Sequence, residues 1–255
     1  MRRPRLLGSL GLITFGAALV VFLLPPIPQD PAYHRFADAR FFWGIPNVLN
    51  VVSNLPMVVL GLAGLCWLRR HRAAAFADPR ETAAYAVFFS GAALVGVGSA
   101  WYHLAPDNAR LFWDRLPMAV TFMAFTSAML AERLDVPLGR RLLVPLLALG
   151  VASVVWWRLT EQAGAGDLRP YAFIHFYPAI LIPALLVLFP ARYSRGGDVW
   201  GVLFFFALTV VSEFLDHAIF ALGGLVSGHT LKHLFAAVAI GWVLRMLATR
   251  HYREA

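Results

Sequence analysis

The chain has 255 residues, of which 60% are hydrophobic and 14% are charged. Soluble domains carry about 45–50% apolar and about 25% charged residues, so a water-soluble globule and a disordered chain are both excluded. The formal net charge of +8 would suggest nucleic-acid binding in a soluble protein. In a membrane protein, an excess of arginine instead marks the cytoplasmic loops, so we expect no nucleic-acid partner.

Eight apolar runs follow one another along the chain. With its flanking residues, each is long enough to cross a bilayer as a helix, in which the backbone groups are paired internally. The runs are apolar on all sides, whereas the strands of a membrane barrel alternate in polarity. The predicted fold is therefore all-α, a polytopic membrane helical bundle. The runs are 6–24, 48–68, 83–103, 116–130, 142–157, 171–189, 199–222 and 231–247.

The first run differs from the other seven because it follows the basic segment MRRPR, as a signal peptide would. However, the run is long and ends in Leu-Leu-Pro-Pro, without a small-x-small cleavage site. We predict an uncleaved transmembrane anchor over residues 1–28, with a signal peptide as the alternative. The other seven runs then form a seven-helix membrane domain over residues 29–255, because no linker or repeat divides that stretch.

The distribution of basic residues predicts the orientation in the membrane. If successive runs cross in alternate directions, most of the 22 basic residues fall on the side of the N-terminus, and the loop between the last two runs has none. By the positive-inside rule, both termini lie in the cytoplasm. The arginine-rich composition suggests a bacterial inner membrane.

Polar residues from three runs gather on the outer side in this topology. Ser99 and His103 end the third run in GVGSAWYH, Asp114 precedes the fourth in LFWDRLPM, and His229 and His233 open the last in SGHTLKH. Residues four apart lie on one face of a helix. Ionisable groups within membrane spans are costly and usually face a cavity or the bundle interior.

Each of these residues has an ordinary structural interpretation when it is taken alone. His103 suits a membrane interface, the His229/His233 pair suits a helix start, Asp114 suits a helix cap, and Ser99 suits helix packing. Two imidazoles four residues apart on a helix can also bind one metal ion. Three histidines with a carboxylate and a hydroxyl at the same depth match the layout of a catalytic zinc, which has three protein ligands and a water.

This combination of motifs resembles the alkaline ceramidase family, whose superfamily also includes the adiponectin and progestin receptors. SxxxH ends one helix, Asp opens the next, and HxxxH lies on the last, while IPNVLNVVSNLP resembles the first core helix of the family. The resemblance spans roughly residues 40–247. It implies a seven-helix zinc hydrolase that cleaves the amide bond of ceramide, or of a related N-acyl lipid, to a fatty acid and an amine base.

The resemblance also implies residue roles. His103, His229 and His233 would hold one zinc ion, while Ser99 and Asp114 would act on the metal-bound water and the reacting carbonyl. The lipid substrate would enter sideways from the bilayer, and the sequence indicates no protein partner.

Calcium is a second metal that the resemblance raises. Eukaryotic ceramidases bind calcium through an N-terminal acidic segment. The corresponding stretch here, YHRFADARFFWGIPN, offers Asp38 and Asn47 but lacks the acidic cluster. Because of this departure from the family pattern, a calcium site is doubtful and we do not assign one.

Two other functions fit parts of the sequence. One is a zinc-containing, receptor-like membrane protein without turnover, although the short loops leave no signalling domain. The other is a proton-coupled transporter in which Glu213, Asp216 and His217 form a relay. Transporter sites usually lie near the midplane between inverted repeats, whereas here the polar residues lie toward the outer side and no repeat is visible.

Overall fold

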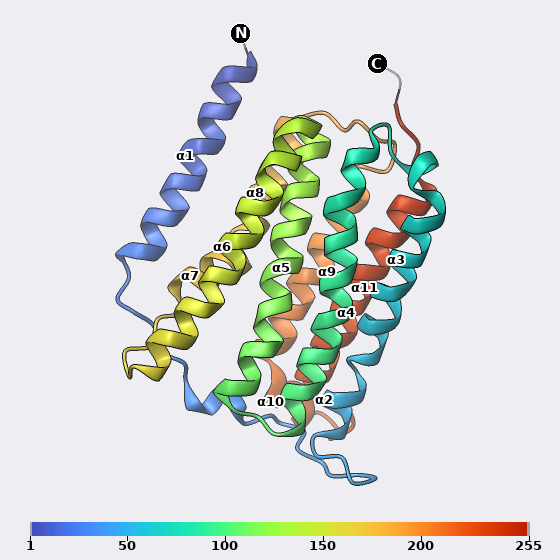
Figure 1. Ribbon diagram of the computed structural model, residues 1–255. Coiled ribbons are helices and arrows are strands. Elements are labelled where there is room, and N and C mark those ends of the chain that lie inside the picture. Colours follow the sequence, from blue (N-terminus) through green and yellow to red (C-terminus); the bar gives the residue numbers. More distant parts are fainter. Residues whose placement is uncertain (1, 254–255) are drawn as a thin grey trace.

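The computed structural model describes residues 2–253 and is an all-α helical bundle (Figure 1), with no strand in the described part of the chain. The predicted fold class is therefore confirmed. Each of the eight apolar runs corresponds to one helix or to a pair of helices joined end to end. The helices are α1 (Arg2–Leu23), α2 (Val48–Val52), α3 (Leu55–Ala75), α4 (Thr82–Leu104), α5 (Asn108–Arg133), α6 (Val136–Gln162), α7 (Arg169–Phe176), α8 (Pro178–Leu188), α9 (Asp198–Phe214), α10 (Asp216–Ala221) and α11 (Gly228–Thr249), with short 3-10 turns at Pro31–His34 and Pro79–Glu81.

Three of the runs that the sequence presents as continuous are interrupted. The run 48–68 divides into α2 and α3, the run 171–189 into α7 and α8, and the run 199–222 into α9 and α10. Pro56 in the first turn of α3 and Pro178 at the start of α8 explain two of these breaks, because proline has no N–H to donate to the preceding turn. The third break, at Leu215, lies beside the candidate site.

Six segments among the described residues are long and apolar enough to cross a membrane, which agrees with a multi-pass membrane protein. The helices α5 and α9 are not among them. Charged residues at both ends of α5 lower its mean hydropathy, and α9 has only 17 residues. Both helices nevertheless pack inside the bundle, where α5 buries most of its second half.

Glycines let neighbouring helices approach closely. A Cβ atom on Gly61 of α3 would lie 2.6 Å from the backbone nitrogen of Ala93 in α4. A Cβ atom on Gly98 of α4 would lie 2.2 Å from the backbone oxygen of Trp113 in α5. Such contacts are typical of membrane helices, where small residues permit the packing that holds helices together.

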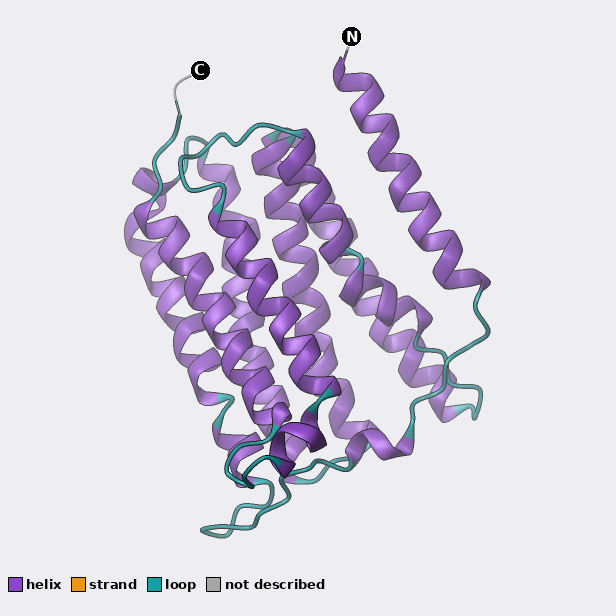
Figure 2. Ribbon diagram, turned by 180° about the vertical axis from the view of Figure 1, so that it is seen from behind, coloured by secondary structure: helices purple, strands orange, loops and turns teal. Residues whose placement is uncertain are grey.

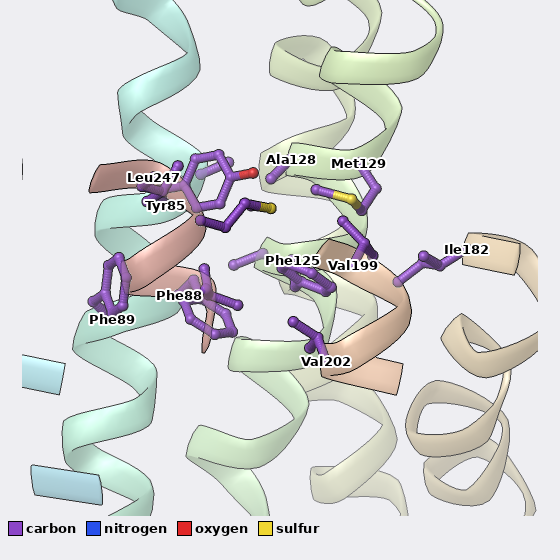
Figure 3. Packing of buried hydrophobic residues seen from close by; sticks show 14 of the residues in the cluster. Tyr85, Phe88, Phe89, Phe125, Ala128, Met129, Ile182, Val199, Val202 and Leu247 are labelled. Carbon is purple, nitrogen blue, oxygen red and sulfur yellow. The ribbon is translucent and has the colours of Figure 1, made fainter. Parts of the chain in front are cut away.

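The apolar core falls into two clusters along the bundle. The larger one joins α4, α5, α8, α9 and α11, and Figure 3 shows Tyr85, Phe125 and Leu247 among its side chains. The smaller one includes Phe36, Tyr102 and other residues of α5, α6 and α7. It lies at the opposite end of the bundle, next to the histidines described below.

The helix α1 stands at the edge of the bundle and packs mainly against α7 and α8 (Figures 1 and 2). Its attachment includes a hydrogen bond between Thr14 and Tyr177, and the Arg169 guanidinium donates to the carbonyls of Phe22 and Leu24. The separation of an anchor over residues 1–28 from a membrane domain over residues 29–255 remains a prediction.

The two ends of the bundle differ in what they hold. The start of α1 and the end of α11 lie at one end, and α2 and α10 lie at the other (Figure 1). The end of α4 and the start of α11 meet near α2 and α10. The predicted histidines therefore lie at the end of the bundle remote from the termini.

Candidate metal centre

Three histidines meet where α4 ends and α11 begins. His103 lies in the last turn of α4, and His229 and His233 lie in the first two turns of α11. All three are buried, and one ring nitrogen from each lies within 4.8 Å of the others. The Nε2 atoms of His103 and His229 are 3.2 Å apart. The convergence expected from the sequence is therefore present, and this cluster can hold a metal ion.

The donor set and its spacing fit zinc. Zinc binds histidine nitrogens at about 2.0–2.1 Å in tetrahedral geometry, which puts two ligand nitrogens about 3.3 Å apart. The separation between His103 and His229 is close to this value. Neutral imidazoles suit zinc and several other transition metals. The three histidines therefore indicate a metal site without identifying the metal.

The outward nitrogens of His229 and His233 have polar neighbours that orient these two rings, whereas Nδ1 of His103 is buried without a hydrogen-bond partner. The Nδ1 atom of His233 lies 2.7 Å from the hydroxyl of Ser53 and 3.4 Å from the amide of Asn54. The Nδ1 atom of His229 lies 3.7 Å from a carboxylate oxygen of Glu213. Partners of this kind orient metal-binding histidines and set which nitrogen is free to bind. Both rings thus direct Nε2 toward the centre of the cluster.

The break between α9 and α10 supports the start of α11. Asp216 accepts a hydrogen bond of 2.7 Å from the backbone N–H of His229 and one of 2.9 Å from that of Ala37. A Cβ atom on Gly228 would lie 2.2 Å from the backbone oxygen of Ser212. Gly228 therefore allows the start of α11 to pack closely against the break between α9 and α10, and Asp216 holds it there by a hydrogen bond.

Ser99 and Asp114 lie beside the histidines, as the sequence predicts. The hydroxyl of Ser99 is 3.4 Å from Nε2 of His233, and both groups are buried. Asp114 is buried one helix away, where its carboxylate interacts with the Ser99 hydroxyl. The close approach of α4 and α5 at Gly98 makes this contact possible.

Phe36 covers the histidines from the segment before α2, and sequence reasoning missed it. Its ring centroid lies 4.6 Å from those of both His103 and His229. Asn50, which is buried, donates to the backbone carbonyl of Asp38 and accepts from Thr230 on α11. The N-terminal segment is thereby tied to the last helix. No periodic pattern could reveal this aromatic cover, because it lies in a loop.

The two residues considered for calcium are engaged within the protein. Arg40 donates to both carboxylate oxygens of Asp38, over 2.7 and 2.6 Å. These bonds hold the pKa of Asp38 below its usual value. The side chain of Asn47 donates to the backbone carbonyl of His103. Both side chains therefore make contacts within the protein.

Lys232 is a second residue that sequence reasoning missed as part of the site. It lies one turn after His229 in α11, is largely buried, and forms an ion pair with Glu213. It is also an electrostatic neighbour of Asp114. The relay considered for a transporter does not assemble, since His217 is exposed while Glu213 and Asp216 face the histidines.

The family model described as Ceramidase matches residues 42–215, which is more than half of the chain. The chain belongs to the ceramidase family. The match covers Ser99, His103 and Asp114 and ends before His229 and His233. No curated protein matches the chain. Membership identifies an amidohydrolase that acts on the amide bond of ceramide, with a lipid substrate and a membrane setting.

Proposed function

We propose that this protein is a zinc-dependent intramembrane hydrolase that cleaves the amide bond of ceramide, or of a related N-acyl lipid, to a fatty acid and an amine base. The main support for this proposal is that three buried imidazoles from two helices lie close enough together to bind one metal ion. Three nitrogen ligands leave the fourth position of a tetrahedral zinc for water or substrate, as in catalytic sites. His103, His229 and His233 would hold the metal.

When bound, zinc would act as a Lewis acid that polarises a carbonyl and lowers the pKa of a bound water to about 7. In our proposal, Asp114 takes the proton from the attacking water and returns it to the amine that leaves. General acid–base catalysis of this kind contributes about 10²–10⁴ in rate. The ammonium of Lys232 is an electrostatic neighbour of the Asp114 carboxylate in this buried site.

Ser99 has a different role in this proposal. Its hydroxyl lies between the His233 ring and the Asp114 carboxylate, where it can donate a hydrogen bond to the oxygen of the reacting carbonyl. Loss of one such donor typically costs about 10²–10³ in rate. Phe36 shields the histidines from water on the side of the N-terminal segment.

The position of the site suits a substrate that comes from the bilayer. The histidines lie at one end of the spanning helices, and in our proposal this is the depth at which a two-tailed lipid carries its amide. The positive-inside rule favours cytoplasmic termini, so the site would face the outer side of the membrane, in a bacterium the inner membrane. Family membership favours this hydrolase over a receptor without turnover or a transporter.

Incubation of the zinc-loaded protein with ceramide, followed by mass spectrometry of the lipids, tests the proposal. We expect equal amounts of fatty acid and sphingoid base. The variant Asp114→Asn should retain zinc and lose about 10²–10⁴ in rate, because the amide cannot accept the proton. If Asp114→Asn hydrolyses ceramide at the original rate, Asp114 is not the general base.

A further inference from the structure

Arg115 is a buried arginine beside the catalytic end of the bundle that the mechanism above does not use. It follows Asp114 in α5, is 5% exposed, and interacts electrostatically with that carboxylate. A charge within a membrane bundle is costly, and such residues mark substrate or ion sites. The position of Arg115 therefore calls for a functional explanation.

Three aromatic rings surround the Arg115 guanidinium. Its central carbon lies 4.4 Å from the ring centroid of Trp157 in α6, 5.0 Å from that of Tyr171 in α7, and 5.4 Å from that of Tyr33 in the N-terminal segment. Cation–π contacts stabilise the charge. They leave the N–H groups in the plane of the guanidinium free to donate. We call these three rings and Arg115 the arginine cage.

The arginine cage supplies no acceptor for the guanidinium. The Nη1 atom is fully buried and has no hydrogen-bond partner among residues 2–253. Two other buried arginines do have acceptors, since Arg133 donates to two backbone carbonyls and Nη1 of Arg250 pairs with Glu132, while Nε and Nη2 of Arg250 lack partners. A buried N–H donor without an acceptor is destabilising, so an acceptor from outside the chain would stabilise the Nη1 end of Arg115.

The arginine cage adjoins the candidate metal centre. Tyr33 lies over Arg115 on one side, and its hydroxyl interacts with Glu213 on the other. Glu213 in turn faces His229 and pairs with Lys232. Three carboxylates, Asp114, Glu213 and Asp216, stand against the two cations Arg115 and Lys232, so a divalent metal would leave the site with one excess positive charge. An anionic ligand would offset that excess.

We propose that Arg115 binds a carboxylate within the active site. The planar guanidinium matches a carboxylate bidentately, which makes arginine the usual residue for this recognition. The carboxylate belongs either to the headgroup of an N-acyl amino acid lipid or to the fatty acid released from the amide. This inference rests on the proposed function for the identity of the ligand but not for the site itself.

Binding of unreactive ligands to the full-length, metal-containing protein in nanodiscs tests this proposal separately from turnover. The probes are palmitate and two ketone analogues in which a methylene replaces the amide nitrogen, one of N-palmitoylglycine and one of N-palmitoylethanolamine. The first analogue carries a carboxylate and the second a neutral hydroxyl. We expect at least one carboxylate probe to bind about ten-fold or more tightly than the neutral analogue.

The variant Arg115→Gln should remove that preference and leave the affinity for the neutral analogue unchanged. Arg110→Gln is the matched control, because Arg110 also lies over a tryptophan, Trp101, at the start of the same helix but away from the arginine cage. A preference for the glycine analogue alone assigns the arginine cage to the substrate headgroup. A preference that includes palmitate assigns it to the released fatty acid.

Equal binding of all three probes by the original protein would overturn the inference. So would an equal loss of all three in Arg115→Gln with the protein still folded, since that result indicates a structural role. Neither result bears on ceramide hydrolysis, which is measured separately. If the protein does not hydrolyse ceramide but keeps its preference for carboxylate probes, the proposed function is refuted and the binding of a carboxylate by Arg115 is not.

Discussion

The two ends of the bundle both bury charged and polar side chains, but they use them differently. At the terminal end, Arg250 pairs with Glu132, and Tyr85 donates to the same carboxylate over 2.6 Å. At the other end, His103, His229 and His233 direct nitrogens toward a common point with no acidic group among them. The first cluster balances its charge within the chain, whereas the second needs a ligand.

This difference separates polar groups that support the fold from polar groups that support function. Arg250 follows α11 and packs its guanidinium 3.9 Å from the ring centroid of Tyr193, so it fixes the far end of the helix that carries His229 and His233. Removal of one partner from a buried ion pair is strongly destabilising, because the other charge is left buried without compensation. Converging imidazoles add little to stability before a ligand arrives. Substitutions at the two ends should therefore affect different properties.

The largest effect is expected for His229→Ala. Removal of one of three ligands should abolish both zinc binding and hydrolysis, while the thermal unfolding of the metal-free protein should change little. Zinc content by inductively coupled plasma mass spectrometry and fatty-acid release measure the two losses. His217→Ala is the control, because His217 is exposed. A zinc content of one per chain in His229→Ala would remove His229 from the ligand set.

The converse effect is expected for Arg250→Leu at the terminal end. It leaves Glu132 buried without its ion pair, which should destabilise the protein by about 3–5 kcal/mol. Zinc bound per folded chain should stay the same. Arg245→Leu is the control, because Arg245 is 52% exposed and only loosely paired with Asp198. If the two variants unfold alike, the buried pair does not stabilise the terminal end.

Gly98→Ala should combine both kinds of effect. The new methyl group would lie 2.2 Å from the backbone oxygen of Trp113, so α4 and α5 must separate next to Asp114. Overpacking of this kind costs about 1–3 kcal/mol. The displacement of Asp114 should also lower the rate with the zinc content unchanged. A Cβ atom on Gly16 in α1 would have no atom within 4 Å, so Gly16→Ala is the control. An unchanged rate in Gly98→Ala would contradict the assigned geometry.

The smallest effect concerns Asp167, in the loop before α7. Hydrogen bonds from Arg169 lower the pKa of Asp167 to about 2. Because the folded pKa lies below the unfolded value of about 3.9, the interaction stabilises the protein above pH 4 and is lost as the pH falls toward 2. Asp167→Asn should therefore lower stability by about 1–2 kcal/mol at pH 6 and much less near pH 2. A difference that does not depend on pH would contradict this assignment.

The sequence predicts much of the fold and the centre of the site. Hydropathy alone locates the helices, since uninterrupted apolar runs have few alternatives in a membrane. The spacing of His229 and His233, and of Ser99 and His103, fixes which side chains share a face, and the alternating topology then brings the faces together.

The remaining features depend on contacts that no periodicity encodes. Ser53 and Phe36 contact the histidines from a helix break and a loop. Lys232 looks like an ordinary cation in the sequence, whereas in the structure it is largely buried and pairs with Glu213 beside His229. In the sequence, Arg115 looks like a basic residue of an outer loop, whereas in the structure it is buried against aromatic rings. Tertiary packing, rather than local pattern, decides these four roles.

The most direct test of the account is the rate of fatty-acid release from ceramide while zinc is added back to the chelated protein. The account predicts no release without metal, a linear rise up to one zinc per chain, and no further rise beyond it. Release that persists in the chelated protein, or that fails to follow zinc up to one equivalent, would contradict the claim that His103, His229 and His233 hold one catalytic ion.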